Sequence, residues 1–424
     1  MERPRVDRNF VFLSVEAAFF SIAAVCFDAA IVLPVFIAQF TSAPLLIGAP
    51  AALRLAGLYL PQLPTALYIR RFKRIKGFLL WQAILGRAVL FACLPMALWA
   101  SIIHPELVLA VVLVAFAVFA FTEGAATLAW LDFVGDVVHP RLRGRFFGGI
   151  GVLGGIGSIA AGFAVRELLG EDVAPPTFVP MFAVGCVCFM ISALGIGLTH
   201  ELPDLRRDQA LDEPTLDHVT SLLRGGHVLR LTVAQVLAGS MQLALPFYVL
   251  FGQARLGLST EWVGGFVVAQ TVGASIAALG WARLAERYGP RVVVTISSAM
   301  LVVLPLLAML AQHVGGGFTL LVTYALGGAA AGGSRVGFWQ CTLDLVPARD
   351  RRVFMGLTNT ANAPTLLMPV LGGLLLEWGG YDWLLTGSVI AGIAATFAGM
   401  QLADPQHAPN ARRAPLMAGL DESV

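Results

Sequence analysis

The residues with the clearest capacity for chemistry are charged side chains inside long apolar runs. Two are carboxylic acids, Asp28 and Glu123, and three are guanidinium groups, Arg54, Arg87 and Arg335. A buried carboxyl group can bind and release a proton, and a neighbouring arginine changes how readily it does so. The chemistry expected of this set is therefore reversible proton binding, biased by ion pairing.

The depth of each charge within its run predicts which charges can meet. Asp28 and Arg54 fall at similar heights and can pair, whereas Arg87 falls at the height of Glu123 or Glu16. Glu16 lies closest to the inner end of its run and is expected to be solvated. Asp28 and Glu123 are the predicted proton carriers, because ionisable residues inside a bilayer are costly and usually functional. The alternative is static pairing that holds helices together, which suffices to explain Arg54 and Arg87.

The second half of the chain has almost no acids in its apolar runs and instead has neutral hydrogen-bonding groups at helical spacing. Such groups on one face of a helix can form a substrate-binding wall. The alternative is hydrogen bonding between helices, which stabilises only weakly in membranes. The predicted wall consists of Gln235, Gln242, Tyr324, Arg335, Asn359 and Asn362.

Acidic and basic residues also gather around short connections between apolar runs. Pairing of these charges predicts a gate on the inner side, and the alternative is that the basic residues only fix the orientation of the chain. The residues of this predicted gate are Asp132, Asp136, Arg141, Arg143, Arg145, Glu286, Arg287, Asp344 and Arg351.

The elements that must position these residues follow from the composition. The 424 residues are 58% apolar and 13% charged, with a net charge of +2 and a mean hydropathy of +0.80. Soluble domains are about 45–50% apolar and about 25% charged. The composition excludes a water-soluble globule, a disordered chain and a nucleic-acid binder. It indicates an all-α membrane protein.

Twelve apolar runs are long enough to cross the hydrocarbon, which takes about 20 helical residues. Helices are expected because the alternating pattern of a membrane β-barrel is absent. The runs are Phe10–Phe40, Leu45–Ile69, Gly77–Ser101, Leu107–Leu131, Phe146–Glu167, Phe178–Thr199, Val228–Phe251, Trp262–Leu284, Val292–His313, Phe318–Leu345, Phe354–Glu377 and Trp383–Leu402.

The distribution of positive charge predicts how the chain lies in the membrane. Of the 28 Lys and Arg residues, 23 fall at the amino terminus, at the carboxyl terminus or in alternate connections between runs. Only Arg166 and Arg255 fall in the remaining connections. Because cytoplasmic segments are enriched in Lys and Arg, both termini are expected in the cytoplasm. An even number of helices is required for that arrangement.

The sequence predicts two halves that repeat one another. Residues 1–200 are expected to form one six-helix bundle and residues 228–403 a second, joined by a cytoplasmic linker over 201–227 and followed by a cytoplasmic tail over 404–424. Leu33–Ile37 in the first run resembles Leu245–Val249 in the seventh. Parallel repeats of this kind occur in transporters that bind substrate between the two repeats.

One connection carries a family signature. Ala282–Arg291 resembles the loop motif of the major facilitator superfamily, with Ala, Glu and Pro at three positions of that pattern, and Thr65–Arg74 keeps only its Leu and basic residues. The resemblance implies alternating access, in which two bundles rock about a central cavity lined by the first, fourth, seventh and tenth helices.

The function expected from these features is secondary active transport of a small solute, coupled to protons, with export favoured because polar groups of the kind that bind sugars are few. The alternatives are an organic-anion or lipid transporter, or a non-transporting assembly protein of the same fold. Neither a phosphate-binding loop nor a metalloprotease motif occurs, so no enzyme activity and no cofactor is expected. The expected partners are a small-molecule substrate, protons and the lipid bilayer, without nucleic acid. The protein is expected as a multi-pass monomer in the plasma (inner) membrane.

Overall fold

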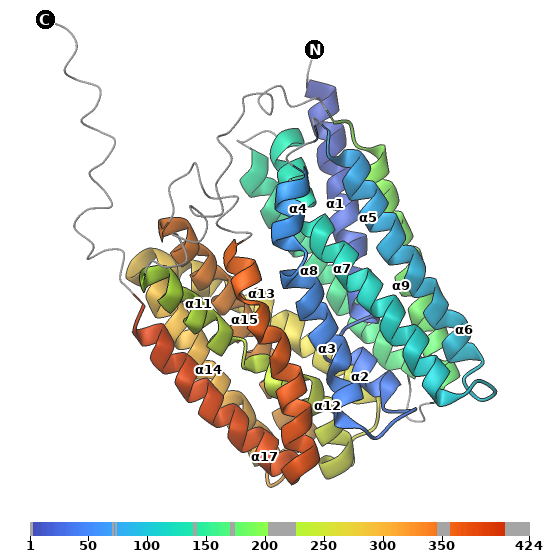
Figure 1. Cartoon of the computed structure of the whole chain (residues 1–424), viewed down its shortest axis with the longest axis vertical. Coiled ribbons are helices and arrows are strands. Elements are labelled where there is room, and N and C mark those ends of the chain that lie inside the picture. Colours follow the sequence, from blue (N-terminus) through green and yellow to red (C-terminus); the bar gives the residue numbers. More distant parts are fainter. Residues whose placement is uncertain are drawn as a thin grey trace, which may run out of the picture.

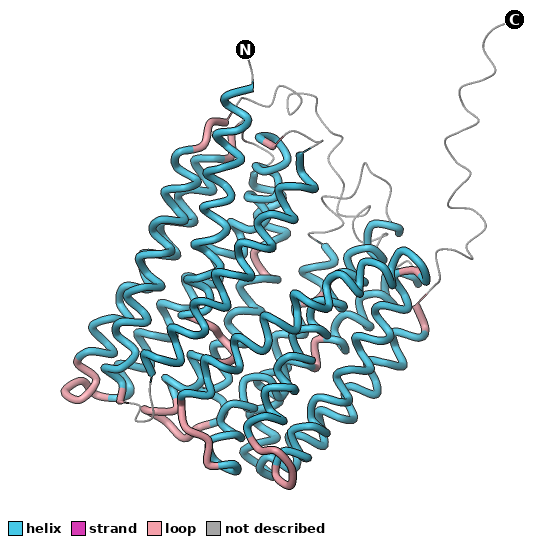
Figure 2. The backbone as a smooth tube through the Cα atoms, turned by 180° about the vertical axis from the view of Figure 1, so that it is seen from behind, coloured by secondary structure: helices cyan, strands magenta, loops and turns pink. Residues whose placement is uncertain are grey.

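The protein is helical throughout the part that can be described. The computed structural model describes residues 3–69, 72, 74–138, 142–169, 174–201, 226–345 and 357–402, and none of these residues forms a β-strand (Figure 2). The expected linker over 201–227 and the expected tail over 404–424 fall almost wholly outside these residues.

The first half of the chain contributes nine α-helices and two short 3-10 turns in the described ranges. They are α1 (Arg3–Cys26), α2 (Val32–Ile37), α3 (Pro44–Tyr59), α4 (Gln62–Ile69), α5 (Lys76–Val89), η1 (Leu90–Ala92), α6 (Cys93–Leu98), α7 (Pro105–Val137), α8 (Arg143–Leu169), η3 (Pro175–Thr177) and α9 (Phe178–Leu198).

The second half is built in the same way. Its described elements are α11 (Gly226–Ala238), α12 (Met241–Leu256), α13 (Glu261–Tyr288), α14 (Pro290–Ala311), α15 (Gly317–Leu345), η5 (Ala363–Leu366) and α17 (Leu367–Met400). Gly380 divides α17, because its φ of 69° is a left-handed backbone conformation that a helix does not contain.

Several of the predicted runs are divided into shorter helices, and two of the breaks place polar side chains at a helix end. Within the run Phe10–Phe40, helix α1 ends at Cys26 and helix α2 begins at Val32, so Asp28 lies in the break between them. Within the run Val228–Phe251, helix α11 ends at Ala238 and helix α12 begins at Met241. The apolar pattern did not reveal either break. Each break frees backbone groups and places polar side chains at a helix end, an arrangement tolerated inside a membrane only where protein or water surrounds it.

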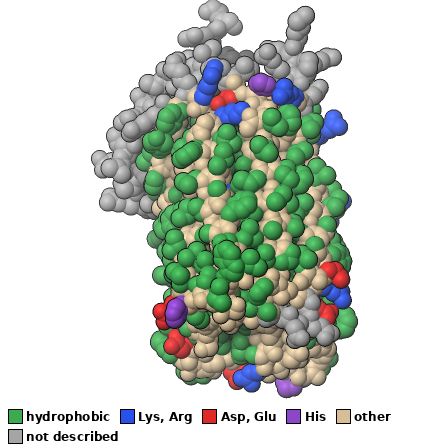
Figure 3. All heavy atoms as spheres, turned by 90° about the vertical axis from the view of Figure 1, so that its right-hand side faces the viewer, with side chains coloured by type: hydrophobic (Ala, Val, Ile, Leu, Met, Phe, Trp, Pro, Cys, Tyr) green, Lys and Arg blue, Asp and Glu red, His purple; other side chains and the backbone are tan. Residues whose placement is uncertain are grey.

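Ten segments of the described chain are long and apolar enough to cross a membrane. One of them, Ala363–Met400, includes the kinked α17. The 29-residue helix α15 is long but is not one of these ten segments. Hydrophobic side chains cover the middle of the molecule, and charged side chains gather at its two ends (Figure 3). Such an apolar belt is expected of a protein embedded in lipid, and the chain is a multi-pass integral membrane protein.

The helices pack in two groups that meet along one another (Figure 1). Helix α1 packs against α8 and α9, and α7 packs against α3 and α5, whereas α15 packs against α13 and α14. The largest contacts between the groups join α8 to α13 and α3 to α17. The groups are closest near α2 and α12 and diverge toward the end at which α1 begins, here called the α1 end (Figures 1 and 2).

A glycine contact fixes the crossing of α3 and α7. A Cβ atom added at Gly124 would overlap the carbonyl oxygen of Gly57, and one added at Gly57 would overlap the backbone of Ala120. Small residues at such contacts let membrane helices approach closely. Because Arg54 lies one turn before Gly57, and Glu123 adjoins Gly124, the contact also brings these two charges near one another.

Replacing Gly124 with Leu should therefore unfold or strongly destabilise the protein. The leucine side chain would meet the backbone of α3, and overpacking of this kind costs about 3 kcal/mol. Thermal unfolding in detergent measures the loss. Gly151→Leu on α8 is the matched control, since an added Cβ there meets no atom within 4 Å. Equal melting temperatures for the two variants would contradict the glycine contact.

Candidate functional site

The first group of helices contains a buried cluster of three charged side chains. Arg87 on α5 donates from Nε to Oε1 of Glu123 on α7 at 2.9 Å. The Nη2 atom of Arg87 lies 3.8 Å from Oε1 of Glu16 on α1. At most 6% of each of these three side chains is exposed. The predicted pairing of Arg87 with Glu123 or Glu16 is confirmed for both acids, whereas the expectation that Glu16 is solvated is wrong.

Neutral and aromatic side chains complete this cluster, called here the Arg87 cluster (Glu16, Arg87, Glu123 and Ser192). Arg87 donates from Nη1 to the Ser192 hydroxyl at 3.1 Å, and this hydroxyl lies 3.2 Å from Oε1 of Glu16. The indole of Trp130 donates to Oε2 of Glu16 at 2.9 Å. The rings of Phe20 and Phe189 lie 5.3 and 5.7 Å from the Arg87 guanidinium, within cation–π range.

Sequence reasoning missed Ser192 and Trp130. Trp130 carried a usable signal, because it follows Glu123 by seven residues and so lies two turns further along the same face of α7. Ser192 carried none, since a single serine in an apolar helix usually bonds its own backbone. Glu16 was misplaced because its depth was judged from the end of an apolar run. In the structure α9 closes over it: a Cβ at Gly195 would lie 2.9 Å from the Glu16 Cβ.

A second polar centre lies at the break between α1 and α2. Oδ1 of Asp28 accepts hydrogen bonds from the backbone N–H groups of Ala30 at 2.9 Å and Ile31 at 2.7 Å. These bonds satisfy donors that the helix break would leave unpaired. Only Oδ1 is used in them, so the second carboxyl oxygen of Asp28 is available for other interactions.

Arg54 lies between the two centres. Its guanidinium interacts electrostatically with the carboxylates of both Glu123 and Asp28. The predicted Asp28–Arg54 ion pair is not formed, because no guanidinium nitrogen of Arg54 lies within 4.0 Å of a carboxyl oxygen of Asp28. The arginine instead links the Asp28 centre to the Arg87 cluster through longer-range electrostatics.

Tyr324 of α15 extends the Asp28 centre into the second group of helices. Its ring stacks on Phe266 with centroids 4.7 Å apart and meets Tyr248 edge-on at 6.2 Å. The side chain is 1% exposed, and its hydroxyl has no hydrogen-bond partner among the described residues. Asp28 lies within electrostatic range of Tyr324, across the interface between the two groups. The structure thus places two predicted site residues, far apart in sequence, in one neighbourhood.

Most of the other predicted wall residues are engaged in contacts between helices. Nδ2 of Asn362 donates to Oε1 of Gln235 at 2.9 Å within the second group. Nδ2 of Asn359 donates to Oε1 of Gln62, on α4 of the first group, at 2.5 Å. Gln242 lies in the first turn of α12, and Arg335 is an exposed side chain of α15. The six residues therefore do not line one continuous surface.

Buried polar atoms around the α11–α12 break remain unpartnered among the described residues. They are the hydroxyls of Ser240 and Thr365 and the Oδ1 atom of Asn362. A Cβ added at Gly239 would overlap the Thr365 side chain, so the break packs directly against η5. Unpaired buried groups are costly unless water or a ligand binds them.

The predicted gate is only partly visible. Arg145, Glu286 and Arg287 are described and exposed, and Asp132 makes an interaction on α7. The other predicted gate residues lie outside the described side chains, namely Asp136, Arg141, Arg143, Asp344 and Arg351.

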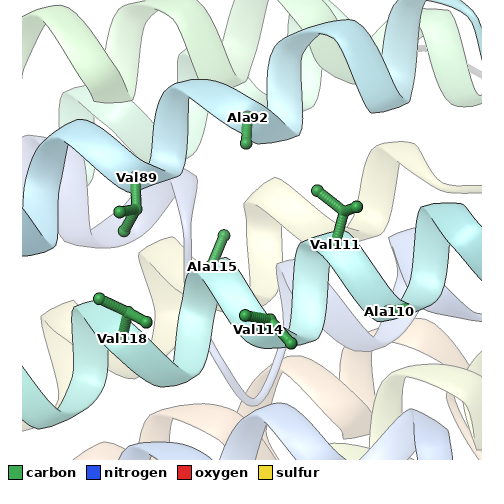
Figure 4. Close-up of a pocket in the computed structure, with 7 residues that line it drawn as sticks. All are labelled: Val89, Ala92, Ala110, Val111, Val114, Ala115 and Val118. Carbon is green, nitrogen blue, oxygen red and sulfur yellow. The ribbon is translucent and has the colours of Figure 1, made fainter.

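One hollow on the surface is unrelated to the charged centres. It has a volume of about 400 Å³ and lies between the α5–η1 segment and α7 (Figure 4). Its lining is entirely valine and alanine, and Val114 in it is 63% exposed. A lining of this kind offers no polar group to orient a solute, and it matches the apolar surface that lipid covers.

Two groups of membrane-spanning helices, with broken helices where they meet and buried charges inside one of them, are typical of a solute transporter. The chain belongs to the major facilitator superfamily, whose model matches residues 17–365 and 263–418. The protein is accordingly a transporter and not an enzyme. No curated protein sequence matches the chain.

Solved structures of this superfamily share the fold at low sequence identity. A mutant of the nucleoside transporter NupG has 17% identity and a TM-score of 0.68, with 92% of this chain and 99% of that chain covered. A D-xylose–proton symporter has 12% identity and a TM-score of 0.70, with coverage of 95% and 99%. A bacterial homologue of the iron transporter ferroportin has 13% identity and a TM-score of 0.61, with coverage of 93% and 98%.

Proposed function

We propose that this protein is a proton-coupled secondary active transporter of a small solute, working by alternating access. The observation that carries the proposal is the pair of acidic centres inside the membrane-spanning region: half-buried Asp28 at the interface of the two helix groups and buried Glu123 within the first group. Buried carboxyls inside a membrane are costly, and they occur where an ion or proton must bind. Membership of the superfamily and likeness to a D-xylose–proton symporter support the proposal.

The proposed membrane topology has twelve helices with both termini in the cytoplasm. Ten described spans, α15, and the division of α17 at Gly380 support this number. We propose domain limits of 1–200, 201–227, 228–403 and 404–424 for the first bundle, linker, second bundle and tail. The α1 end is then the cytoplasmic side of the plasma (inner) membrane, and the chain acts as a monomer.

In the proposed cycle, protonation of Asp28 changes the interactions between the two bundles. A neutral Asp28 no longer attracts Arg54, so the equilibrium between the two conformations shifts. Glu123 adds a second site whose charge depends on Arg87. A solute that binds the unpartnered polar atoms of Ser240, Thr365 and Asn362 would bias the same equilibrium, which is the basis of coupling.

The substrate is expected to be a small solute with hydrogen-bonding groups, and the proposed direction is export. The similar structures carry substrates as different as nucleosides and D-xylose, so the fold itself does not select among them. A thermal-shift screen of the purified protein against metabolites and drugs identifies ligands, because binding to the native state raises the melting temperature.

The test of the function is flux of such a ligand in vesicles with an imposed pH gradient. We expect flux that stops when the gradient is collapsed, and opposite responses for right-side-out and everted vesicles. Flux that is indifferent to the gradient would contradict proton coupling, and flux driven only inward would contradict export.

Joining the two bundles through the Gln62–Asn359 contact should stop the cycle. With cysteines at both positions, a short bifunctional thiol crosslinker would link α4 to the segment before η5. Because the two bundles must move relative to one another, we expect at least about tenfold slower transport, restored when the linker is cleaved. The flux assay above measures the rate, in a background in which the five native cysteines are replaced with alanine.

The matched control joins Gln235 to Asn362, which make the analogous contact within the second bundle. Crosslinking there should leave transport nearly unchanged, because both positions belong to one moving body. Equal inhibition by the two crosslinks would contradict rigid-body motion of the bundles.

A further inference from the structure

The Arg87 cluster holds more negative than positive charge. Two carboxyl groups, Glu16 and Glu123, approach the single guanidinium of Arg87. The neighbouring Arg54 does not balance this excess, because it also lies near Asp28. The buried cluster therefore holds two acids and one arginine, whereas Asp28 and Arg54 are only half-buried. One further positive charge is needed for neutrality.

An uncompensated charge in this position is strongly unfavourable. The side chains of the three charged residues are at most 6% exposed, and aromatic rings cover the guanidinium. Two neighbouring carboxylates in such a setting seldom ionise together, since each disfavours the charge on the other. A bound proton is the smallest group that restores neutrality, and the described contacts leave these oxygens engaged with hydrogen-bond donors rather than arranged around a metal ion.

The geometry distinguishes the two acids. Glu123 accepts a close charge-assisted hydrogen bond from Nε of Arg87 at 2.9 Å. Glu16 reaches Arg87 chiefly through Ser192, whose hydroxyl lies 3.2 Å from its Oε1. A hydroxyl can rotate to donate or to accept a hydrogen bond. Ser192 can therefore accept a hydrogen bond from a protonated Oε1 of Glu16 as readily as it donates one to an ionised Oε1. Trp130 anchors the other oxygen in both cases.

We propose that Glu16 and Glu123 together hold one proton against Arg87, which makes this cluster a second proton-binding site beside Asp28. Glu16 carries the proton in the arrangement described here, and Glu123 carries it when Arg87 turns toward Glu16. The proton is bound by oxygen lone pairs, and no other bond is made or broken. The cluster's part in transport rests on the proposed function, whereas the bound proton does not.

The surroundings contain few other groups that could titrate in place of this pair. From α5 and α7 the charged or polar groups that face the cluster are Arg87, Glu123 and Trp130, and from α9 the group is Ser192. From α3 Arg54 acts on Glu123. From α8 the residues that meet α1 near the cluster are glycines, Gly154 against Ser21 and Gly157 against Ile22.

Infrared difference spectroscopy of the purified full-length protein, between neutral and alkaline buffer, tests the proposal without a substrate. A protonated carboxyl group has a carbonyl stretch that an ionised one lacks. We expect the wild type to show this band at neutral pH and lose it at alkaline pH. Asp28→Asn should retain it.

The signature of a shared proton is its loss in either single variant. Glu16→Gln leaves Glu123 balanced by Arg87, and Glu123→Gln leaves Glu16 balanced by the same arginine, so in the Asp28→Asn background both should lose the band completely. Persistence of the band in Glu123→Gln would overturn sharing, because the proton would belong to Glu16 alone. Loss in Asp28→Asn, or no band in the wild type, would also overturn the proposal.

Ser192→Ala is a second variant that keeps all three charged groups and so tests the site even if a glutamine variant fails to fold. Its band should persist at a shifted frequency, because the hydroxyl near Oε1 of Glu16 is gone, and an unshifted band would overturn the assignment. The outcome is separate from transport: the expected bands together with gradient-independent flux would contradict the proposed function and leave the shared proton standing.

Discussion

Replacing Asp28 with Asn should abolish transport driven by a pH gradient while leaving a folded protein. Asparagine keeps an oxygen where Oδ1 accepts hydrogen bonds from Ala30 and Ile31, so the break between α1 and α2 remains satisfied. It removes the ability to bind a proton reversibly. We expect a loss of at least about a hundredfold, the scale that losing a proton-transfer group typically causes, measured as gradient-driven flux in vesicles.

Asp28→Ala separates the proton-binding role from the structural one. Alanine loses the charge and both hydrogen bonds, and loss of a helix-capping side chain costs about 1 kcal/mol. We therefore expect Asp28→Ala to have a lower melting temperature than Asp28→Asn, and both variants to lack gradient-driven flux. If Asp28→Asn retained gradient-driven flux, Asp28 would be only a structural residue of the helix break.

Replacing Arg87 with Met should destabilise the protein by about 3–5 kcal/mol, the usual cost of removing one partner from a buried ion pair. Methionine fills part of the same volume but leaves Glu16 and Glu123 without a counter-ion. The contacts of the guanidinium with Phe20 and Phe189 are also lost. Chemical or thermal unfolding in detergent measures the change.

A neutralised cluster provides the control. Combining Arg87→Met with Glu16→Gln and Glu123→Gln removes all three charges, and buried ion pairs replaced as a set are often neutral in stability. We expect the triple variant to recover most of the lost stability without recovering transport. A triple variant less stable than Arg87→Met would show that charge balance does not determine the stability of this cluster.

The sequence was sufficient for the membrane-protein class, the family and the main charged residues. Apolar runs of about 20 residues reveal spans because the bilayer sets their length, and charges within those runs stand out for the same reason. Depth alone indicated Glu123 or Glu16 as the partner of Arg87, and the structure shows contacts with both. The superfamily resemblance of Ala282–Arg291 was carried by one loop, and the family model confirms it across the chain.

What the sequence did not reveal depends on the third dimension. Depth along a run does not give the direction of a side chain, which is why an Asp28–Arg54 pair was left open and Glu16 was expected to be solvated. Helix breaks at Asp28 and Gly239 are hidden inside apolar runs. The contacts of Gln62 with Asn359, and of Glu16 with Ser192, join residues whose sequence positions carry no mutual signal.

The most direct test of alternating access driven by protonation is a pair of inter-bundle distances measured by double electron–electron resonance at two pH values. One spin-label pair replaces Gly77 and Tyr288, both exposed near the α1 end, and the other replaces Ile102 and Phe318, both exposed at the opposite end. We expect that lowering the pH changes the two distances in opposite senses and that Asp28→Asn removes this response. Distances that stay constant with pH at both ends, or that change together, would contradict it.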